Sequence, residues 1–305
     1  MDHDIQKLEV LRRKASASIV STIAAAIFIA YILLLILSTS GSLFMALFIA
    51  APIGLVFGFL FYKLFGCKKS LATYRAFFKS IFVEAPFRNA FEELTYHSDE
   101  GFSQELIKNT GLMCLGNIYN TNDYIQGTYH NVKFERADVK IQQHVSTGKT
   151  SYTVTYFNGR WLILDFNKEF HFDLQILKKD FYNSKKKGTF FTNDEERRHR
   201  IELEDVEFNE MFHVFGQDDH EAFYILTPQF MEILKEMAST LDGEFMLGFV
   251  DNRLHVAINT GKDAMEHSVL SKVNSFPIEQ EVQKEINVII NIIDGLDLDS
   301  DIFNN

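Results

Sequence analysis

The sequence predicts an α+β protein in which an N-terminal transmembrane helical hairpin precedes a mainly antiparallel mixed α+β cytoplasmic domain. Two long apolar runs near the N-terminus, an apolar period of two after Asp123, and amphipathic helical patterns before and after those strands favour this fold class. The expected segments are a cytoplasmic N-terminal segment (1–18), a first transmembrane helix (19–37), an extracytoplasmic turn (38–42), a second transmembrane helix (43–62) and a cytoplasmic α+β domain (63–305).

The two apolar runs have the length of membrane spans. Ile19–Leu37 holds no charge in nineteen positions, and Leu43–Tyr62 holds none in twenty. At 1.5 Å per residue, each makes a helix of about 28–30 Å, which matches the hydrocarbon core of a bilayer. A cleaved signal peptide is disfavoured, because its apolar region is about 7–15 residues long and here a second span follows at once.

Charge sets the expected orientation of this hairpin. Through Ala85 the chain has nine Lys and Arg against four Asp and Glu. The Lys and Arg residues flank the hairpin at its outer ends. Short flanks rich in Lys and Arg stay in the cytoplasm, so both termini are expected inside, with anionic lipid attracting the flanks. Neither span carries an ionisable side chain, which indicates an anchor in the lipid bilayer rather than a channel or pump.

Small residues four apart mark a helix-packing face. Gly54 and Gly58 have this spacing in the second span, as do Ser21 with Ala25 and Ala26 with Ala30 in the first. Such faces let two helices approach closely. The favoured interpretation is that the two spans pack on each other. The alternative is that the glycine face also makes a homo-oligomer.

The remainder of the chain is acidic. From Pro86 onward there are 37 Asp and Glu against 21 Lys and Arg, which repels phosphate backbones and argues against nucleic-acid binding. The chain has two cysteines, Cys67 and Cys114, a number that fits a reducing compartment.

Periodicity assigns the elements after the membrane. A helix is expected over 69–97 with a break at Pro86, and a short helix over Ser103–Asn109 ends before Gly111. Strands are expected at 132–141, 152–157, 161–166, 170–177, 212–215, 222–226, 245–250 and 254–258. The dipeptides Asn158-Gly159 and Asp251-Asn252 predict hairpin turns. Helices are expected from Thr227-Pro228 to about Thr240, and from Pro277 to about Gly295.

Four stretches carry a resemblance to a known family: Asn122–Gly127, Phe157–Lys168, Glu204–Phe212 and, most specifically, Glu221–Pro228. Through them residues of roughly 70–295 resemble a bacterial family known as domain of unknown function 3137. Its members typically look like two-span anchors followed by a cytoplasmic domain, which implies a multi-pass protein of the bacterial inner (plasma) membrane. The resemblance implies no reaction, ligand or catalytic residue. Relatives tend to have proline where this chain has Val206, a difference that bears on the local turn.

Several ligand-type patterns lack the context of a site. Gly148-Lys149-Thr150 has neither the earlier glycine nor the following helix of a phosphate loop. The cluster formed by His213, Asp218, Asp219, His220 and Glu221 spans a turn and has no metal-ligand spacing. The sequence therefore predicts no cofactor and no metal site.

The hypothesis that follows is a membrane-anchored cytoplasmic binding or scaffold module that is not an enzyme. A polar groove for a peptide or cationic ligand is its candidate site, lined by Arg160, Trp161, Glu204, Asp205, Glu207 and Glu221, and another membrane or cytoplasmic protein is its expected partner. The alternatives are a membrane-tethered hydrolase-type enzyme whose site assembles only in the fold, and an accessory subunit of a membrane transport complex.

Overall fold

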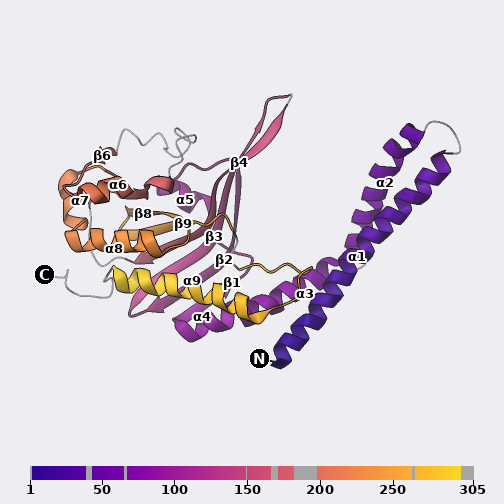
Figure 1. Ribbon diagram of the computed structural model, residues 1–305, viewed down its shortest axis with the longest axis horizontal. Coiled ribbons are helices and arrows are strands. Elements are labelled where there is room, and N and C mark those ends of the chain that lie inside the picture. The colour runs from indigo at the N-terminus through magenta and orange to yellow at the C-terminus, as the bar shows by residue number, and fades with distance from the viewer. Residues whose placement is uncertain are drawn as a thin grey trace. The chain divides into compact units, whose positions relative to one another are not determined.

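A computed structural model describes residues 2–38, 43–64, 67–148, 150–165, 171–181, 198–262 and 265–296 (Figure 1). Most of the expected extracytoplasmic turn, residues 39–42, lies outside these ranges. The chain forms two compact units: unit 1 comprises Met1–Ala85 and Glu266–Gln280, and unit 2 comprises Pro86–Met265 and Glu281–Asn305. The sequence predicted a domain beginning at residue 63, whereas the structure groups residues 63–85 and 266–280 with the N-terminal helices.

Unit 1 is helical. Its elements are α1 (Asp2–Ser38), α2 (Leu43–Leu64), α3 (Cys67–Lys79), a π-helical turn (Ser80–Glu84) and the start of α9 (Ser275–Gly295). Helices α1 and α2 pack closely along the small-residue face. A Cβ atom added to Gly54 would lie 2.7 Å from the Cβ of Ala30, and one added to Gly58 would lie 2.7 Å from the Cβ of Ala26. Only glycine allows this approach, because such distances are far below van der Waals contact.

The N-terminal helix α1 is apolar over most of its length. Among the side chains that the structure describes, one stretch, His3–Leu35, is long and apolar enough to cross a membrane by length and composition. The described apolar part of α2, Phe48–Phe59, is shorter.

The first turns of α1 belong to a hydrophobic cluster with α3. Leu8 and Ala15 are buried there against Tyr74, Phe78 and Phe82. The segment before α9 joins this cluster, since Arg12 donates to the Val269 carbonyl at 3.0 Å. Its His267 ring lies 2.9 Å from the Tyr74 hydroxyl. The N-terminal end of α1, which precedes its apolar run, is therefore fixed by side-chain packing.

Unit 2 is a nine-stranded antiparallel sheet with helices, which confirms the predicted mixture of helix and antiparallel strand. The strand order is β1-β2-β3-β4-β9-β8-β5-β7-β6. The strands are β1 (Glu92–His97), β2 (Ile118–Tyr129), β3 (Val132–Ser146), β4 (Ser151–Asp165), β5 (Leu174–Lys178), β6 (His199–Ile201), β7 (Phe212–Gly216), β8 (Glu244–Val250) and β9 (Arg253–Asn259). The helices are α4 (Ala85–Ala90), α5 (Gln104–Asn109), α6 (Val206–Met211), α7 (Asp219–Ile225), α8 (Pro228–Thr240) and most of α9.

Both faces of the central strands are buried. On one face, Trp161 and Ile163 of β4 pack in a cluster with Ala137 and Val139 of β3 and with Ile107 of α5. Side chains alternate along a strand, so the residues between them point to the opposite face. That face carries charged groups and is contacted by α9, as described below.

Side chains cap the described ends of α5 and α8, and the cap of α8 is the predicted one. Ser103 caps α5 by accepting from the Leu106 amide, and Thr227 caps α8 by accepting from the Phe230 amide with Pro228 as the first helical residue. The hairpin at Asp251-Asn252 is confirmed, with both residues at positive φ as a type I′ turn requires. The predicted apolar face of α9 is also confirmed, because Val282, Ile286, Ile289 and Ile293 are buried.

Three predicted elements are wrong. Glu92–His97 is an edge strand rather than the end of a helix, since it pairs with β2. Asp219–Ile225 is a helix rather than a strand, because the Asp218 side chain accepts from the Glu221 amide and caps it. Asn158-Gly159 is no turn: β4 runs straight through it, and a Cβ at Gly159 would lie 2.0 Å from the Ile258 carbonyl oxygen. This glycine serves the close approach of β9 rather than a reversal of the chain.

Candidate functional site

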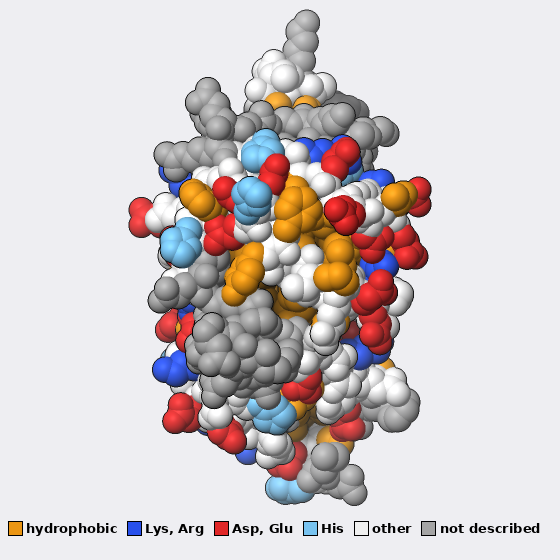
Figure 2. Space-filling model, turned by 90° about the vertical axis from the view of Figure 1, so that its left-hand side faces the viewer, with side chains coloured by type: hydrophobic (Ala, Val, Ile, Leu, Met, Phe, Trp, Pro, Cys, Tyr) orange, Lys and Arg blue, Asp and Glu red, His pale blue; other side chains and the backbone are white. Residues whose placement is uncertain are grey.

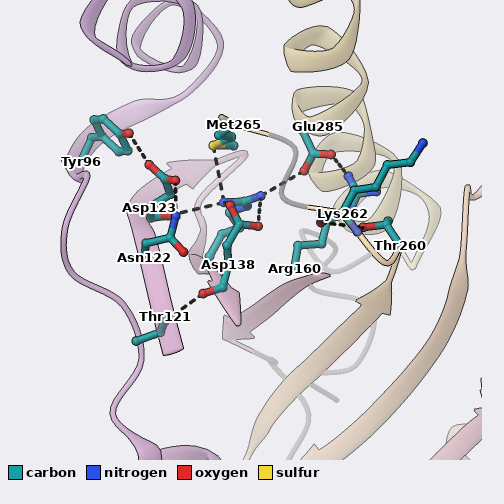
Figure 3. Close-up of polar contacts among 11 residues, drawn as sticks. Tyr96, Thr121, Asn122, Asp123, Asp138, Arg160, Thr260, Lys262, Met265 and Glu285 are labelled. Carbon is teal, nitrogen blue, oxygen red and sulfur yellow. Dashed lines mark hydrogen bonds and ion pairs between the residues drawn. The ribbon is translucent and has the colours of Figure 1, made fainter. Parts of the chain in front are cut away.

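A buried ion-pair network lies between the sheet and α9 (Figure 3). Arg136 of β3 makes a two-pronged contact with Asp138, at 2.8 and 3.0 Å. Its Nη2 atom also lies 3.2 Å from Glu285 of α9. Arg160 of β4, the register partner of Asp138, donates to the other oxygen of Glu285. One helix carboxylate thus bridges two arginines on neighbouring strands.

The network continues across β2 and β1. The Asp123 carboxylate accepts from the Tyr96 hydroxyl at 2.5 Å and from the Asn122 amide at 2.7 Å. The sulfur of Met265 lies 3.5 Å from Arg136 Nη1. Burial raises the pKa of Tyr96, and the neighbouring Asp123 carboxylate raises it further. The phenol therefore stays a neutral donor to Asp123.

This network is enclosed rather than open to a ligand. Arg136 is 1% exposed and Glu285 is 4% exposed. Burial alone would lower the pKa of Arg136, but the Asp138 and Glu285 carboxylates outweigh it and raise the pKa. A buried charge with complete partners of opposite sign is stable, and removal of one partner is costly. The geometry assigns these residues to holding α9 on the sheet.

Trp161 lies on the opposite face of β4 from Arg160 and is fully buried. Its indole Nε1 donates to Nδ1 of His255 at 3.2 Å, and its ring meets that of Phe157 edge-on. Burial lowers the pKa of His255 to about 4, with the Arg253 charge adding to the effect. The imidazole is therefore neutral at pH 7, with Nδ1 as the acceptor.

Two of the predicted carboxylates share a partner. Asp205 caps α6 by accepting from the Phe208 amide at 3.0 Å, and that bond, followed by Lys235, lowers its pKa. The Lys235 ammonium of α8 lies 3.3 Å from Asp205 and 3.0 Å from Glu207. A third contact of 2.7 Å joins Lys235 to Glu232. These bonds tie α6 to α8.

The other two predicted carboxylates lie apart from that pair. Glu221 of α7 accepts from the backbone amide of His171 at 2.5 Å, which joins α7 to the segment before β5. Glu204 is exposed in the turn that precedes α6. Of the six residues predicted to line one groove, Asp205 and Glu207 are brought together by Lys235.

The predicted grouping of Arg160 and Trp161 with these carboxylates needs correction. Neighbouring residues of a strand point to opposite faces, so these two cannot line one groove. Arg160 is paired with Glu285 under α9, and Trp161 is inside the core. No contact among the described residues joins either one to the four carboxylates.

Sequence patterns missed four exposed apolar side chains, one on α6, two on α7 and one just before β5. Val206 is 71% exposed, Tyr224 is 57% exposed, and Phe172 and Phe223 are also exposed. We call these four residues the α6–α7 patch. Figure 2 shows hydrophobic side chains gathered on this face of the molecule, with carboxylates and imidazoles around them. Exposed hydrophobic clusters on a soluble surface mark binding sites. The available signal was Val206 itself, which follows a capping aspartate and so opens a helix with its side chain outside the core.

The surroundings of the patch are strongly acidic. Residues 202–240 contain ten Asp and Glu and one Lys. The exposed carboxylates include Glu207 and Glu210 of α6, Asp219 of α7 and Glu232 of α8. The Lys235 ammonium is engaged by three carboxylates and does not offset this field at the surface.

The predicted ligand-type cluster does not assemble as a metal centre. Within the part of the chain that the structure describes, no group of three His, Cys, Asp or Glu side chains is arranged to hold a metal ion. His199 and Asp219 do form a pair at 2.6 Å, with both side chains more than half exposed. Burial lowers the pKa of His213, and the Arg200 charge adds to that effect.

Comparison with known proteins bears on the family. Residues 155–298 match the family described as "Protein of unknown function (DUF3137)", which confirms the resemblance over three of the four stretches that carried it. No curated protein matches the chain. A crystal structure of the mycobacterial trehalose monomycolate transport factor A, TtfA, is similar with a TM-score of 0.32 and 10% identity, over 70% of this chain and 93% of that chain. A score of this size carries no argument about fold or function.

Replacing Glu285 by Ala tests the buried network. The change leaves Arg136 and Arg160 without their shared carboxylate, so we expect the free energy of unfolding to fall by about 3–5 kcal/mol. The matched control is Glu281→Ala in the same helix, whose exposed pair with Lys284 at 3.5 Å should be worth less than about 1 kcal/mol. Urea unfolding followed by tryptophan fluorescence measures both, since Trp161 is the only tryptophan of the chain. Equal effects of the two changes would contradict the assigned role.

His255 predicts a pH dependence of stability. The unfolded chain protonates this residue near its ordinary pKa of 6.5, while the folded chain does so only near 4. The contribution of neutral His255 to the free energy of unfolding is therefore complete above pH 6.5 and is lost as the pH falls toward 4. From pH 7 to pH 5 we expect it to remove about 2 kcal/mol from the free energy of unfolding. A His255→Gln variant, which keeps an acceptor for the indole and does not titrate, should lack this part of the slope in urea unfolding. An unchanged slope would contradict the buried neutral imidazole.

Proposed function

We propose, from the match of residues 155–298 to the DUF3137 family, that the chain is a membrane-anchored cytoplasmic binding or scaffold module rather than an enzyme. The single observation that carries the proposal is the α6–α7 patch, an exposed apolar surface within an acidic surrounding. The proposed location is the bacterial plasma membrane, with both termini in the cytoplasm.

The anchor in this proposal is a two-span hairpin made by α1 and α2. The support is the absence of charged residues from 19–37 of α1 and 43–62 of α2, and the contact of Gly54 and Gly58 with the alanines of α1. A contact that needs no ionisable or bulky side chain is the kind that two helices make in lipid. The Lys and Arg residues at the outer ends favour the proposed orientation.

The proposed occupant of the α6–α7 patch is a segment of a partner protein that combines apolar and basic side chains. Apolar residues would cover Val206, Phe223 and Tyr224, while Lys or Arg residues would meet the surrounding carboxylates. Charge complementarity of this kind raises association rates and excludes acidic partners. The excess of ten acidic residues over one basic residue in 202–240 supports a basic partner.

An enzymatic function has weaker support. The His199–Asp219 pair has the distance of a catalytic hydrogen bond, but both side chains stand at the surface in water. Proton-transfer sites gain much of their effect from a water-excluded environment. The buried charged groups Arg136 and Glu285 form an ion pair with each other, so neither is placed to act on a substrate.

Protease access tests the proposed topology. In intact spheroplasts, trypsin added outside should leave unit 2 uncut, because the membrane shields it. In inverted membrane vesicles the same treatment should cleave unit 2. Cleavage of unit 2 in spheroplasts, with a periplasmic control protein digested and a cytoplasmic control protein intact, would refute the cytoplasmic location.

A pair of designed peptides tests the patch. The probe is a fluorescent amphipathic helix of Leu and Lys, and its matched control replaces every Lys by Glu. With the full chain in nanodiscs of neutral lipid, we expect the Lys peptide to bind and the Glu peptide not to bind, as measured by fluorescence anisotropy. A double change, Val206→Ser and Tyr224→Ser, should weaken binding at least tenfold because it removes apolar contact without altering charge.

The control for this experiment is Leu270→Ser, which removes an exposed leucine of unit 1. It should leave the affinity unchanged. Equal binding by the patch variant and the unaltered chain would show that the peptide responds to net charge alone, and the proposed site would be wrong. Circular dichroism of both variants establishes that the fold is intact.

A further inference from the structure

The β3–β4 hairpin extends beyond the rest of the sheet as a two-stranded ribbon (Figure 1). Strand β2 stops pairing with β3 at Gln142, and β9 stops pairing with β4 at Gly159. Beyond these points β3 and β4 still pair with each other, down to Ser146 and Ser151. The ribbon therefore has two lateral edges that the sheet does not extend to cover.

One of these edges is capped by a side chain. The amide of Asn117, just before β2, donates to the His144 carbonyl at 2.9 Å and accepts from the His144 backbone amide at 2.7 Å. Asn117 thus satisfies both main-chain groups of His144, as a neighbouring strand would. The main-chain groups of His144 must point away from β4 to make these bonds.

The register then fixes the direction of the main chain on the other edge. His144 lies directly opposite Thr153 of β4. In an antiparallel pair, two opposite residues either bond to each other or both direct their main-chain groups outward. Since His144 points outward to Asn117, the N–H and C=O of Thr153 point outward on the β4 edge. No strand among the described residues is paired with Ser151–Val154 on that side.

Of the features that keep strand edges apart, Ser151–Val154 lacks charge, while the pairing of β3 with β4 is irregular beside it, between Ile141 and Gln142. Proteins protect edges with charge, bulges or short length. The edge strand β1 has Glu92 and Glu93 at an irregularity in its pairing, and β6 is three residues long with Arg200 at its centre. By contrast, Ser151–Val154 has no charge, no glycine and no proline, and Tyr152 is 55% exposed.

We propose that the β4 edge of this ribbon pairs with the same edge of a second copy of the chain, antiparallel about a two-fold axis at Thr153. The sequence of the edge is self-complementary in this register. Thr153 faces Thr153 of the second copy, and Tyr152 faces Val154 on either side. Threonine pairs and pairs of an aromatic with a β-branched residue are among the favourable cross-strand combinations. The two outward Thr153 main chains exchange N–H to O=C bonds.

Disulfide trapping in membranes tests the pairing directly. In a Cys67→Ser, Cys114→Ser background of the full chain, Thr153→Cys should give a disulfide-linked dimer under mild oxidation. The two Cα atoms of such a hydrogen-bonded pair are about 5.5 Å apart, within disulfide range. The matched control is His144→Cys, at the same level of the ribbon on the capped edge, which should give at least tenfold less dimer. No dimer at position 153, or equal amounts at both positions, overturns the proposal.

Charge exchange separates pairing from a general effect on folding. Thr153→Lys and Thr153→Glu each place like charges opposite one another, so each should reduce the dimer severalfold in sedimentation of the detergent-solubilised protein. Co-expression of the two variants should restore a mixed dimer, and His144→Lys should leave the dimer unchanged. Failure of the mixture to recover overturns the two-fold register. A disulfide adduct of Thr153→Cys with another protein would place an unrelated strand on this edge and also overturn it.

Discussion

The carboxylate of Glu285 between Arg136 and Arg160 is the constraint on which the arrangement of unit 2 depends. Those arginines lie on adjacent central strands, and both are buried. A buried guanidinium is tolerated only with a carboxylate in place, so the sheet and the α9 residues 281–295 are interdependent. Apolar packing of Val282, Ile286 and Ile289 supplies much of the attraction between them, but it would tolerate a shift along the helix. The two ion pairs admit one register.

Side chains alternate along β4, so Arg160 and Trp161 lie on opposite faces of the sheet. Arg160 serves the face covered by α9, and the next residue, Trp161, serves the hydrophobic face with His255. From the sequence alone, both side chains were predicted to line a binding groove. In the fold each is committed to an interior partner. The two surfaces proposed above for recognition, the α6–α7 patch and the β4 edge of the ribbon, contain neither Arg160 nor Trp161.

The sequence was most informative where a local interaction decides the structure. Thr227-Pro228 defines the start of α8 because the cap and the fixed φ of proline act within one turn. Asp251-Asn252 defines a hairpin because both residues accept positive φ. Asn158-Gly159 has an equally strong local signal for a turn, yet it lies within β4. There the close approach of the Ile258 carbonyl of β9 requires a glycine within the strand, and this pairing overrides the preference of Asn-Gly for a turn.

The sequence by itself determined the long apolar N-terminal helix, the mixture of helix with antiparallel strands, the helix α5, the capped helix α8, and the family resemblance of residues 155–298. These depend on hydrophobic period, charge and capping, which act over a few residues. Only the tertiary structure decided that Arg160 and Trp161 belong to different faces, that Glu285 joins two strands more than a hundred residues away in sequence, and that Asn117 caps one edge of a ribbon. Each of those facts is a pairing between distant segments, and register between distant segments is set by the packing of the whole sheet.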